Sequence, residues 1–150
     1  MTDPRDEYFM AIALGEAAAA ADEGEVPVGA VITDGQHILA KTHNMTERLN
    51  DVTAHAEMMA ITAAAEALGG KYLPQCTLYV TVEPCPMCAG ALGWSQIGRI
   101  VYGASDPKKG FMRFCNGAIS PLHPHTIVTP GVLEEDASEM MKNFFKERRK

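Results

Sequence analysis

Several features of other protein classes are missing from this sequence of 150 residues. No apolar run approaches the roughly twenty residues that a membrane-spanning helix requires. Residues 1–7 are rich in charge and lack the apolar stretch of a secretory signal. Internal repeats and low-complexity linkers are also absent. We therefore expect a single globular domain over residues 1–150, with no membrane partner.

Positive charge is scarce, because 13 Lys and Arg stand against 19 Asp and Glu and give a net charge of -6. This balance excludes a generally basic protein that binds nucleic acid without regard to sequence. Local groups of basic residues occur at residues 146–150 and at Lys108 and Lys109. The C-terminal group predicts either a local RNA contact or a solvated helix end that complements its own dipole.

Cysteine is also infrequent, with four in the chain. Cys85 and Cys88 are three residues apart and flank the start of a predicted helix, with Pro84 and Pro86 beside them. His55 and Glu57 stand at the start of another predicted helix. A catalytic zinc takes three protein ligands and leaves the fourth position to water. The four residues therefore predict such a site, with His55, Cys85 and Cys88 as ligands and Glu57 as a free carboxylate that moves protons. Four cysteines, two of them metal ligands, also favour a reducing cytoplasm.

Each half of this pattern has a simpler interpretation when it is taken alone. A lone Cys-x-x-Cys is more often a redox pair or half of a structural zinc site, for which Cys76 or Cys115 could supply the fourth ligand. His123 and His125 lie in a Pro-rich loop and are not expected to bind metal. The complete order, His-x-Glu followed by Pro-Cys-x-x-Cys, is much more specific and is the signature of the zinc nucleobase deaminases.

Four segments carry a closer resemblance: residues 25–31, 53–58, 78–91 and 101–106. They resemble the bacterial tRNA-specific adenosine deaminases of the cytidine/deoxycytidylate deaminase superfamily, over nearly the whole chain. The resemblance implies a zinc-dependent hydrolytic deaminase, without an organic cofactor, that converts the wobble adenosine of a tRNA anticodon to inosine. It also implies a homodimer. The implied substrate-binding residues are Asn44, Val26, Ala56 and Asp106. The basic C-terminal helix end and the loop lysine predict RNA contacts at Lys108, Phe145, Lys146, Arg148 and Arg149.

Two other functions remain open from the sequence. One is a deaminase of a free base or nucleoside, such as guanine or cytosine, within the same superfamily. The other is a non-catalytic zinc domain that binds RNA, although a structural site has no use for the unligated carboxylate of Glu57. The long segment 105–125 departs from the family pattern. Its Phe111 and Phe114 could stack on a base, contact a second subunit or pack within the fold.

The remaining pattern predicts a three-layer α/β/α arrangement on a mixed five-stranded sheet, which is the cytidine deaminase-like fold that the resemblance implies. Helices are expected over residues 6–23, 56–68 and 133–150, and from Cys85 to about Ser95. Strands are expected over residues 28–33, 38–42, 76–82, 99–102 and 126–129. The first two strands form a hairpin at Asp34-Gly35, and the third and fourth run parallel across a helix.

Overall fold

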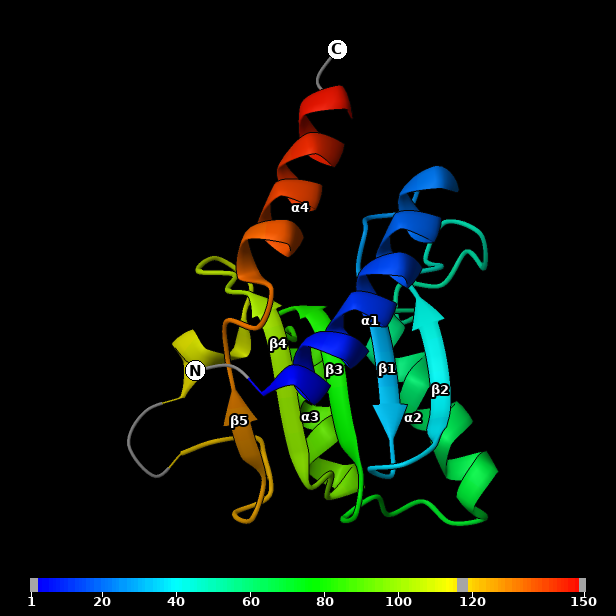
Figure 1. Cartoon of the computed structure of the whole chain (residues 1–150), viewed down its shortest axis with the longest axis vertical. Coiled ribbons are helices and arrows are strands. Elements are labelled where there is room, and N and C mark those ends of the chain that lie inside the picture. The colour runs from blue at the N-terminus through cyan, green and yellow to red at the C-terminus, as the bar shows by residue number, and fades with distance from the viewer. Residues whose placement is uncertain (1–2, 116–118, 149–150) are drawn as a thin grey trace.

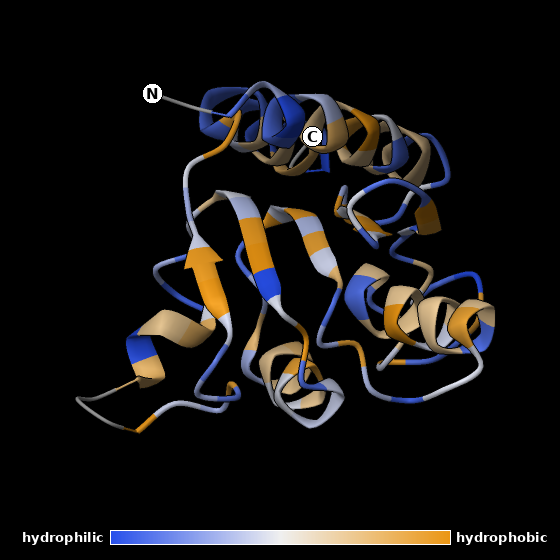
Figure 2. Ribbon diagram, turned by 60° about the horizontal axis from the view of Figure 1, so that its bottom comes forward, coloured by the Kyte–Doolittle hydropathy of each residue, from blue (hydrophilic) through white to orange (hydrophobic). Residues whose placement is uncertain are grey.

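The computed structural model describes residues 3–115 and 119–148. A sheet lies between two layers of helices, as Figures 1 and 2 show from two directions. The helices are α1 (Pro4–Asp22) and α4 (Glu134–Arg148) on one face and α2 (Ala56–Leu68) and α3 (Pro86–Ser95) on the other. The three-layer α/β/α prediction is therefore confirmed.

The sheet is mixed and has five strands in the order β2-β1-β3-β4-β5. The strands are β1 (Gly29–Thr33), β2 (Ile38–His43), β3 (Thr77–Val82), β4 (Arg99–Ala104) and β5 (Ile127–Thr129). Strand β1 runs antiparallel to both β2 and β3, whereas β3, β4 and β5 are parallel to one another. The crossover between β3 and β4 contains α3, as a parallel pair requires.

Most predicted boundaries are confirmed within a residue or two, and two details differ. Strand β4 continues to Ala104, two residues beyond the predicted end. The irregular segment 105–125 contains one short 3-10 helix, η1 (Phe111–Phe114).

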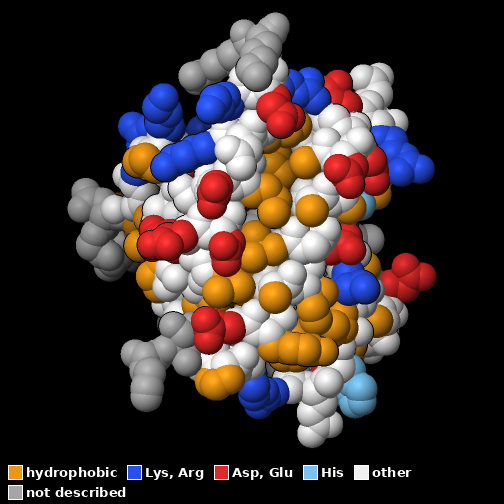
Figure 3. Space-filling view, turned by 45° about the horizontal axis from the view of Figure 1, so that its top comes forward, with side chains coloured by type: hydrophobic (Ala, Val, Ile, Leu, Met, Phe, Trp, Pro, Cys, Tyr) orange, Lys and Arg blue, Asp and Glu red, His pale blue; other side chains and the backbone are white. Residues whose placement is uncertain are grey.

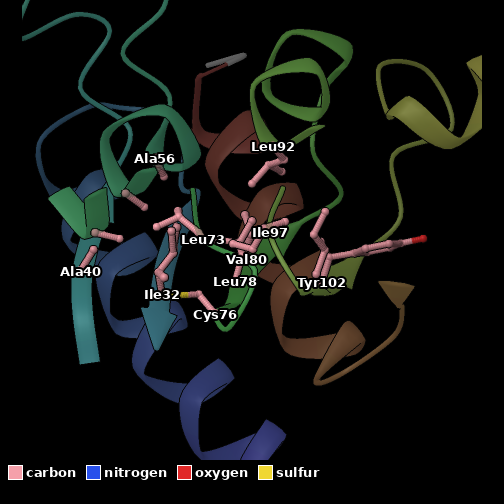
Figure 4. Close-up of a cluster of buried hydrophobic side chains, with 14 of the residues drawn as sticks. Ile32, Ala40, Ala56, Leu73, Cys76, Leu78, Val80, Leu92, Ile97 and Tyr102 are labelled. Carbon is pink, nitrogen blue, oxygen red and sulfur yellow. The ribbon is translucent and has the colours of Figure 1, made fainter. Parts of the chain in front are cut away.

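The core forms on both faces of the central strands, because β1, β3 and β4 are buried along almost their whole length. Figure 4 shows the larger cluster, in which Ile32, Leu78 and Val80 of the sheet meet Leu92 of α3. On the other face, α1 crosses β1 at Gly29. A Cβ atom at that position would lie 2.0 Å from the carbonyl oxygen of Ala13, so only glycine allows this contact.

Two features of the architecture determine where a site can form. The carboxyl ends of β3 and β4 and the amino ends of α2 and α3 meet at one edge of the sheet, which is where ligands bind in open α/β folds. At the opposite end of β4, Arg99 holds the Asp6 carboxylate of α1 with two hydrogen bonds of 2.8 and 2.6 Å.

Within residues 3–115 and 119–148, no helix has the length and apolar character of a membrane span.

Candidate metal centre and active site

His55, Cys85 and Cys88 come together at the sheet edge described above. Nδ1 of His55 lies 3.6 Å from Sγ of Cys85 and 3.6 Å from Sγ of Cys88. One ligand atom from each residue falls within 4.8 Å of the others. Both helices begin here: His55 is the N-cap of α2 and Cys85 is the N-cap of α3. Free backbone N–H groups and the helix dipoles favour thiolate at such positions.

The pKa values of the two thiols in this cluster shift in opposite directions. The Cys88 thiol and the His55 imidazole, which both face Cys85, lower the pKa of Cys85 to about 4 against the opposing effect of burial. The bond to Cys85 in turn raises the pKa of His55. The hydrogen bond to Cys85, together with burial, raises the pKa of Cys88. Two sulfurs and one imidazole nitrogen are a donor set that suits a borderline-soft cation.

The Cys76 and Cys115 thiols do not belong to the cluster that the structure describes. Cys76 is buried in the core at the start of β3, and the Cys115 thiol points at the carbonyl oxygen of Phe111. His125 is bonded to the carbonyl oxygen of Gln96 at the far end of α3. Among the described residues, the cluster thus has three protein ligands and no fourth, which is the pattern of an open site.

Glu57 lies one residue into α2 and is only 4% exposed. Burial, and next the charge of Cys85, raise the pKa of Glu57 to about 7, against the opposing hydrogen bonds. The side chain lines the cavity beside the cluster without being one of its ligands. A carboxyl group in this position is suited to exchange protons with a bound molecule near neutral pH.

A cavity of about 560 Å³ opens onto the cluster. Its walls come from the residues just before β1, the loop between β2 and α2, the carboxyl ends of β3 and β4, the loop after β4 and one face of α4. The lining residues besides His55, Glu57 and Cys85 are Val26, Val28, Asn44, Thr46, Val82, Glu83, Ala104, Ser105, Asp106, Pro107, Lys108, Lys109, Ser138, Met141, Lys142 and Phe145. Volumes of this order are typical of ligand sites in proteins.

Three of the four residues predicted to bind substrate, Val26, Asn44 and Asp106, line this cavity. Ala56 does not, because it is fully buried, and its backbone N–H donates to Oδ1 of Asn44 at 2.8 Å. A free Asn side chain offers both a donor and an acceptor to a ligand. Since the Asn44 oxygen is bonded to Ala56, the amide NH2 group is the part left for a ligand.

Only some of the predicted RNA contacts line the cavity. Lys108 and Phe145 line the cavity, whereas Lys146 does not. Arg148 lies over the ring of Phe144 and donates to the carbonyl oxygen of Gly24, so it links α4 to the end of α1. The predicted contact Arg149 lies outside the described residues.

Sequence reasoning missed the wall that α4 supplies. Met141, Lys142 and Phe145 lie three, four and seven residues after Ser138, so the four residues share one face of the helix. This spacing could have indicated a common face, although not what the face would meet. Lys108, Lys109 and Lys142 bring positive charge to a cavity that is also lined by Glu57, Glu83 and Asp106. Figure 3 shows Lys and Arg side chains gathered toward the top of one face of a molecule whose net charge is negative.

The two aromatic residues of the divergent segment have different environments. Phe111 is 1% exposed and packs into the fold. Phe114 is 58% exposed, and the guanidinium group of Arg113 lies over its ring. Simple packing therefore accounts for Phe111, while Phe114 is free to contact another molecule.

Comparison with known proteins agrees with this geometry. Residues 3–104 match the family described as the cytidine and deoxycytidylate deaminase zinc-binding region. The tRNA-specific adenosine deaminase of Bacillus subtilis is 44% identical over 97% of this chain and 92% of its own length. A structure from a study of A-to-I editing by tRNA:A34 deaminases has a TM-score of 0.82 and 43% identity, covering 89% of this chain and 98% of that one.

A guanine deaminase from Bacillus subtilis is also similar, with 40% identity and a TM-score of 0.63, although the match covers 66% of this chain and 64% of that one. Fold and site together define a nucleobase deaminase of the cytidine deaminase-like class. The chain belongs to the cytidine and deoxycytidylate deaminase family and, within it, to the tRNA-specific adenosine deaminases. The resemblance in the motifs is thus confirmed over nearly the full length.

Proposed function

We propose that this protein is a zinc-dependent hydrolytic deaminase that converts the wobble adenosine of a tRNA anticodon to inosine. The observation that carries the proposal is the three-residue cluster of His55, Cys85 and Cys88 beside the unligated carboxylate of Glu57, at the floor of a cavity. The relatives named above, which share more than two fifths of the sequence, support the choice of substrate.

The cluster fits zinc in its spacing as well as its chemistry. Zn–S bonds of about 2.3 Å and Zn–N bonds of about 2.0–2.1 Å in a tetrahedral site place sulfur and nitrogen about 3.6 Å apart. The His55 nitrogen lies 3.6 Å from each sulfur. We therefore assign His55, Cys85 and Cys88 as the zinc ligands. When bound, zinc supplies a water molecule of lowered pKa in the open fourth position.

Glu57 carries the protons in this proposal. Deamination adds water at C6 of the purine and releases ammonia, so one proton must reach the ring nitrogen and another the leaving amine. Glu57 takes the first proton from water and delivers it to the ring nitrogen while the hydroxyl group adds to C6. It then takes the remaining proton from this C6 hydroxyl group and passes it to the amine, so that the C–N bond breaks, ammonia leaves and a C6 carbonyl forms. Its buried position next to the cluster keeps it within the cavity while leaving it free of the metal.

Asn44, Val26 and Asp106 surround the base in the proposed complex. The NH2 group of Asn44 donates to the purine edge, and Val26 and Val28 offer apolar contact to its face. Ala56 acts through Asn44, whose oxygen it holds. The cavity of about 560 Å³ is large for a free base alone, and its lysine residues suit a phosphate backbone that extends from the target nucleotide. A site at this depth reaches only a base that is splayed out of a stack, as in an anticodon loop.

Deamination of guanine is the second candidate, because the guanine deaminase match extends over two thirds of the chain. Ammonia release from the purified, zinc-loaded protein distinguishes the two. We expect release with a wobble-adenosine anticodon stem-loop and none with guanine, cytosine or adenosine at equal concentration. Release from guanine without release from the stem-loop would establish the second candidate and refute the first.

We further propose a homodimer of single-domain subunits that is formed through the layer of α2 and α3. Met87 and Trp94 are seven residues apart on α3 and are 37% and 84% exposed, and Val52 before α2 is 84% exposed. We assign these exposed apolar side chains to the contact surface of the proposed dimer. Trp94→Glu should convert the dimer to a monomer in sedimentation velocity, whereas Tyr8→Glu on the opposite layer should not.

We also propose that the protein acts in the cytoplasm. Its four cysteines form no disulfide, as is usual in a reducing compartment, and its proposed tRNA substrate is found there.

A further inference from the structure

We infer that Glu25 and Glu83 are positioning residues that hold the two loops on opposite sides of the cavity in their binding geometry. One loop is residues 45–50, after Asn44, and the other is residues 105–112, after β4. Neither carboxylate belongs to the metal cluster. The inference rests on the proposed function for the identity of the substrate that these loops meet.

Glu83 ties both ends of its loop together. It follows β3 and is 7% exposed. One carboxylate oxygen accepts the backbone N–H of Asp106 at 3.0 Å, and the other accepts the backbone N–H of Met112 at 2.9 Å. The Glu83 N–H itself donates to the carbonyl oxygen of Ala104 at 2.8 Å. The side chain therefore fixes the loop where it leaves the sheet and again where it reaches η1.

The packing of the loop gives independent support for this arrangement. A Cβ atom at Gly110 would lie 2.2 Å from the carboxyl group of Glu83, so the loop backbone passes directly over that carboxylate. Phe111 is buried, and its N–H donates to the carbonyl oxygen of Pro84 at 2.9 Å. The loop is thus fastened to the two residues that immediately precede the ligand Cys85.

This loop carries three of the polar residues that face the cavity: Asp106, Lys108 and Lys109. The Asp106 carboxylate also accepts the N–H groups of Lys108 and Lys109 at 3.1 and 3.0 Å, which shapes the turn between them. Because the turn begins at the amide that Glu83 holds, displacement of the Glu83 carboxylate would move both lysines relative to the metal cluster.

Glu25 makes the same kind of attachment on the other side. It is 1% exposed, and its oxygens accept the backbone N–H groups of Glu47 at 3.1 Å and Arg48 at 2.9 Å. The Thr46 hydroxyl donates to it at 3.3 Å, and Thr46 lines the cavity. Burial works to raise the pKa of Glu25, but the N–H donors outweigh it and lower the pKa. Glu25 is therefore a stable anion at the centre of its loop.

The hydrogen bonds also show that Glu25 and Glu83 differ in role from the proposed proton carrier Glu57. Both oxygens of Glu83 face backbone donors, which can only donate, so protonation of the carboxylate would break a bond to the loop. Glu83 lines the cavity and has the residue type of a proton carrier, yet its contacts are those of a structural acceptor. We therefore place it outside the proton-transfer chemistry.

Amide hydrogen exchange in the zinc-loaded protein, without substrate, tests the inference directly. Glu83→Gln keeps the side-chain volume but turns an NH2 group toward one backbone donor. Exchange at Asp106 and Met112 should accelerate on the order of tenfold, while Glu47 and Arg48 keep their wild-type rates. Glu25→Gln should give the opposite pattern and serves as the matched control. Unchanged exchange at all four amides in both variants would overturn the inference.

A second variant reaches the same attachment without altering a carboxylate. Gly110→Ala inserts a methyl group against Glu83 and should accelerate exchange at the same two amides as Glu83→Gln. With an anticodon stem-loop, both variants should raise KM about tenfold or more, and by a larger factor than kcat falls, at wild-type zinc content. A fall in kcat with unchanged KM and unchanged exchange would place Glu83 in the chemistry and refute its positioning role. The exchange measurement needs no substrate, so it can fail or succeed independently of the proposed function.

Discussion

The side-chain oxygen of Asn44 accepts a hydrogen bond of 2.8 Å from the backbone N–H of Ala56. Asn44 follows β2, and Ala56 is the first residue of α2, next to the ligand His55. The bond therefore connects one wall of the cavity to the helix that carries both a metal ligand and Glu57. It also orients the amide, since the oxygen is engaged and the NH2 group is left for the substrate.

Replacement of Asn44 tests this orientation. Asn44→Asp keeps an oxygen for the Ala56 N–H but substitutes an acceptor for the donor that faces the base. We expect kcat/KM for a stem-loop substrate to fall about 10- to 100-fold, which corresponds to one lost or opposed hydrogen bond. Asn50→Asp is the control, because Asn50 is an exposed residue of the same loop and does not line the cavity. Equal kcat/KM values for Asn44→Asp and the wild type would show that the amide donor is not used.

Glu57→Gln tests the assignment of the proton carrier. The amide has the same shape but cannot accept a proton from water, so kcat should fall by a factor of about a hundred or more. Zinc content by elemental analysis should stay near one ion per chain. Glu66→Gln, an exposed position on the same helix, should leave both values at wild type. Loss of zinc from Glu57→Gln would instead make Glu57 a ligand, and full activity would require another base.

Lys142 and Lys146 form a matched pair on α4, since both are exposed and the first alone lines the cavity. Binding of the anticodon stem-loop should weaken with salt in proportion to the number of phosphate contacts. Lys142→Ala should reduce the slope of log K against log salt by about 0.7 to 0.9, the value for one contact. Lys146→Ala should leave the slope unchanged. Equal slopes for both variants would show that the wall of α4 does not contact RNA backbone.

Acid stability should depend on Asp6. Burial works to raise the pKa of Asp6, but Arg99 and Tyr79 outweigh it and lower the pKa. The stabilisation is therefore present above the unfolded pKa of about 3.9 and is lost as pH falls through the folded pKa. Asp6→Asn should lower the free energy of unfolding at pH 7 by about 3 kcal/mol, because it leaves Arg99 unpaired.

The control for this experiment is Glu7→Gln, which removes an exposed acid from the same helical turn. Urea unfolding at pH 7 and at pH 3 should show a smaller loss of stability on acidification for Asp6→Asn than for the wild type. Parallel losses for the wild type and Asp6→Asn would contradict the assignment.

The metal cluster could be predicted from the sequence because its parts are local. The proline residues around Cys85 restrict where a helix can begin, and the left-handed conformation of Gly69, with a φ of 73°, ends α2 where Gly69-Gly70 predicted. The strands also follow from local pattern, since β3 and β4 are short and rich in β-branched and aromatic residues. Spacing within two short motifs was therefore enough to predict the cluster of His55, Cys85 and Cys88 and the helices at whose starts they lie.

The cavity walls could not be predicted in the same way, because they depend on contacts between distant segments. The face of α4 that bears Lys142 follows from helical period, but only packing against β4 directs it to the cavity. The oxygens of Glu25 and Glu83 accept backbone N–H groups, which every non-proline residue carries, so no side-chain pattern marks their partners. The sequence places Arg148 in a basic tail. In the structure, its guanidinium group donates to the carbonyl oxygen of Gly24 and lies over the ring of Phe144.

The most direct test of the central claim is position-resolved nucleoside analysis of a wobble-adenosine anticodon stem-loop after incubation with zinc-loaded protein. We predict inosine at the wobble position, no inosine elsewhere, one ammonia per inosine, and loss of the product in Glu57→Gln. Absence of inosine from protein that contains one zinc per chain would contradict the account, as would full product formation by protein without zinc.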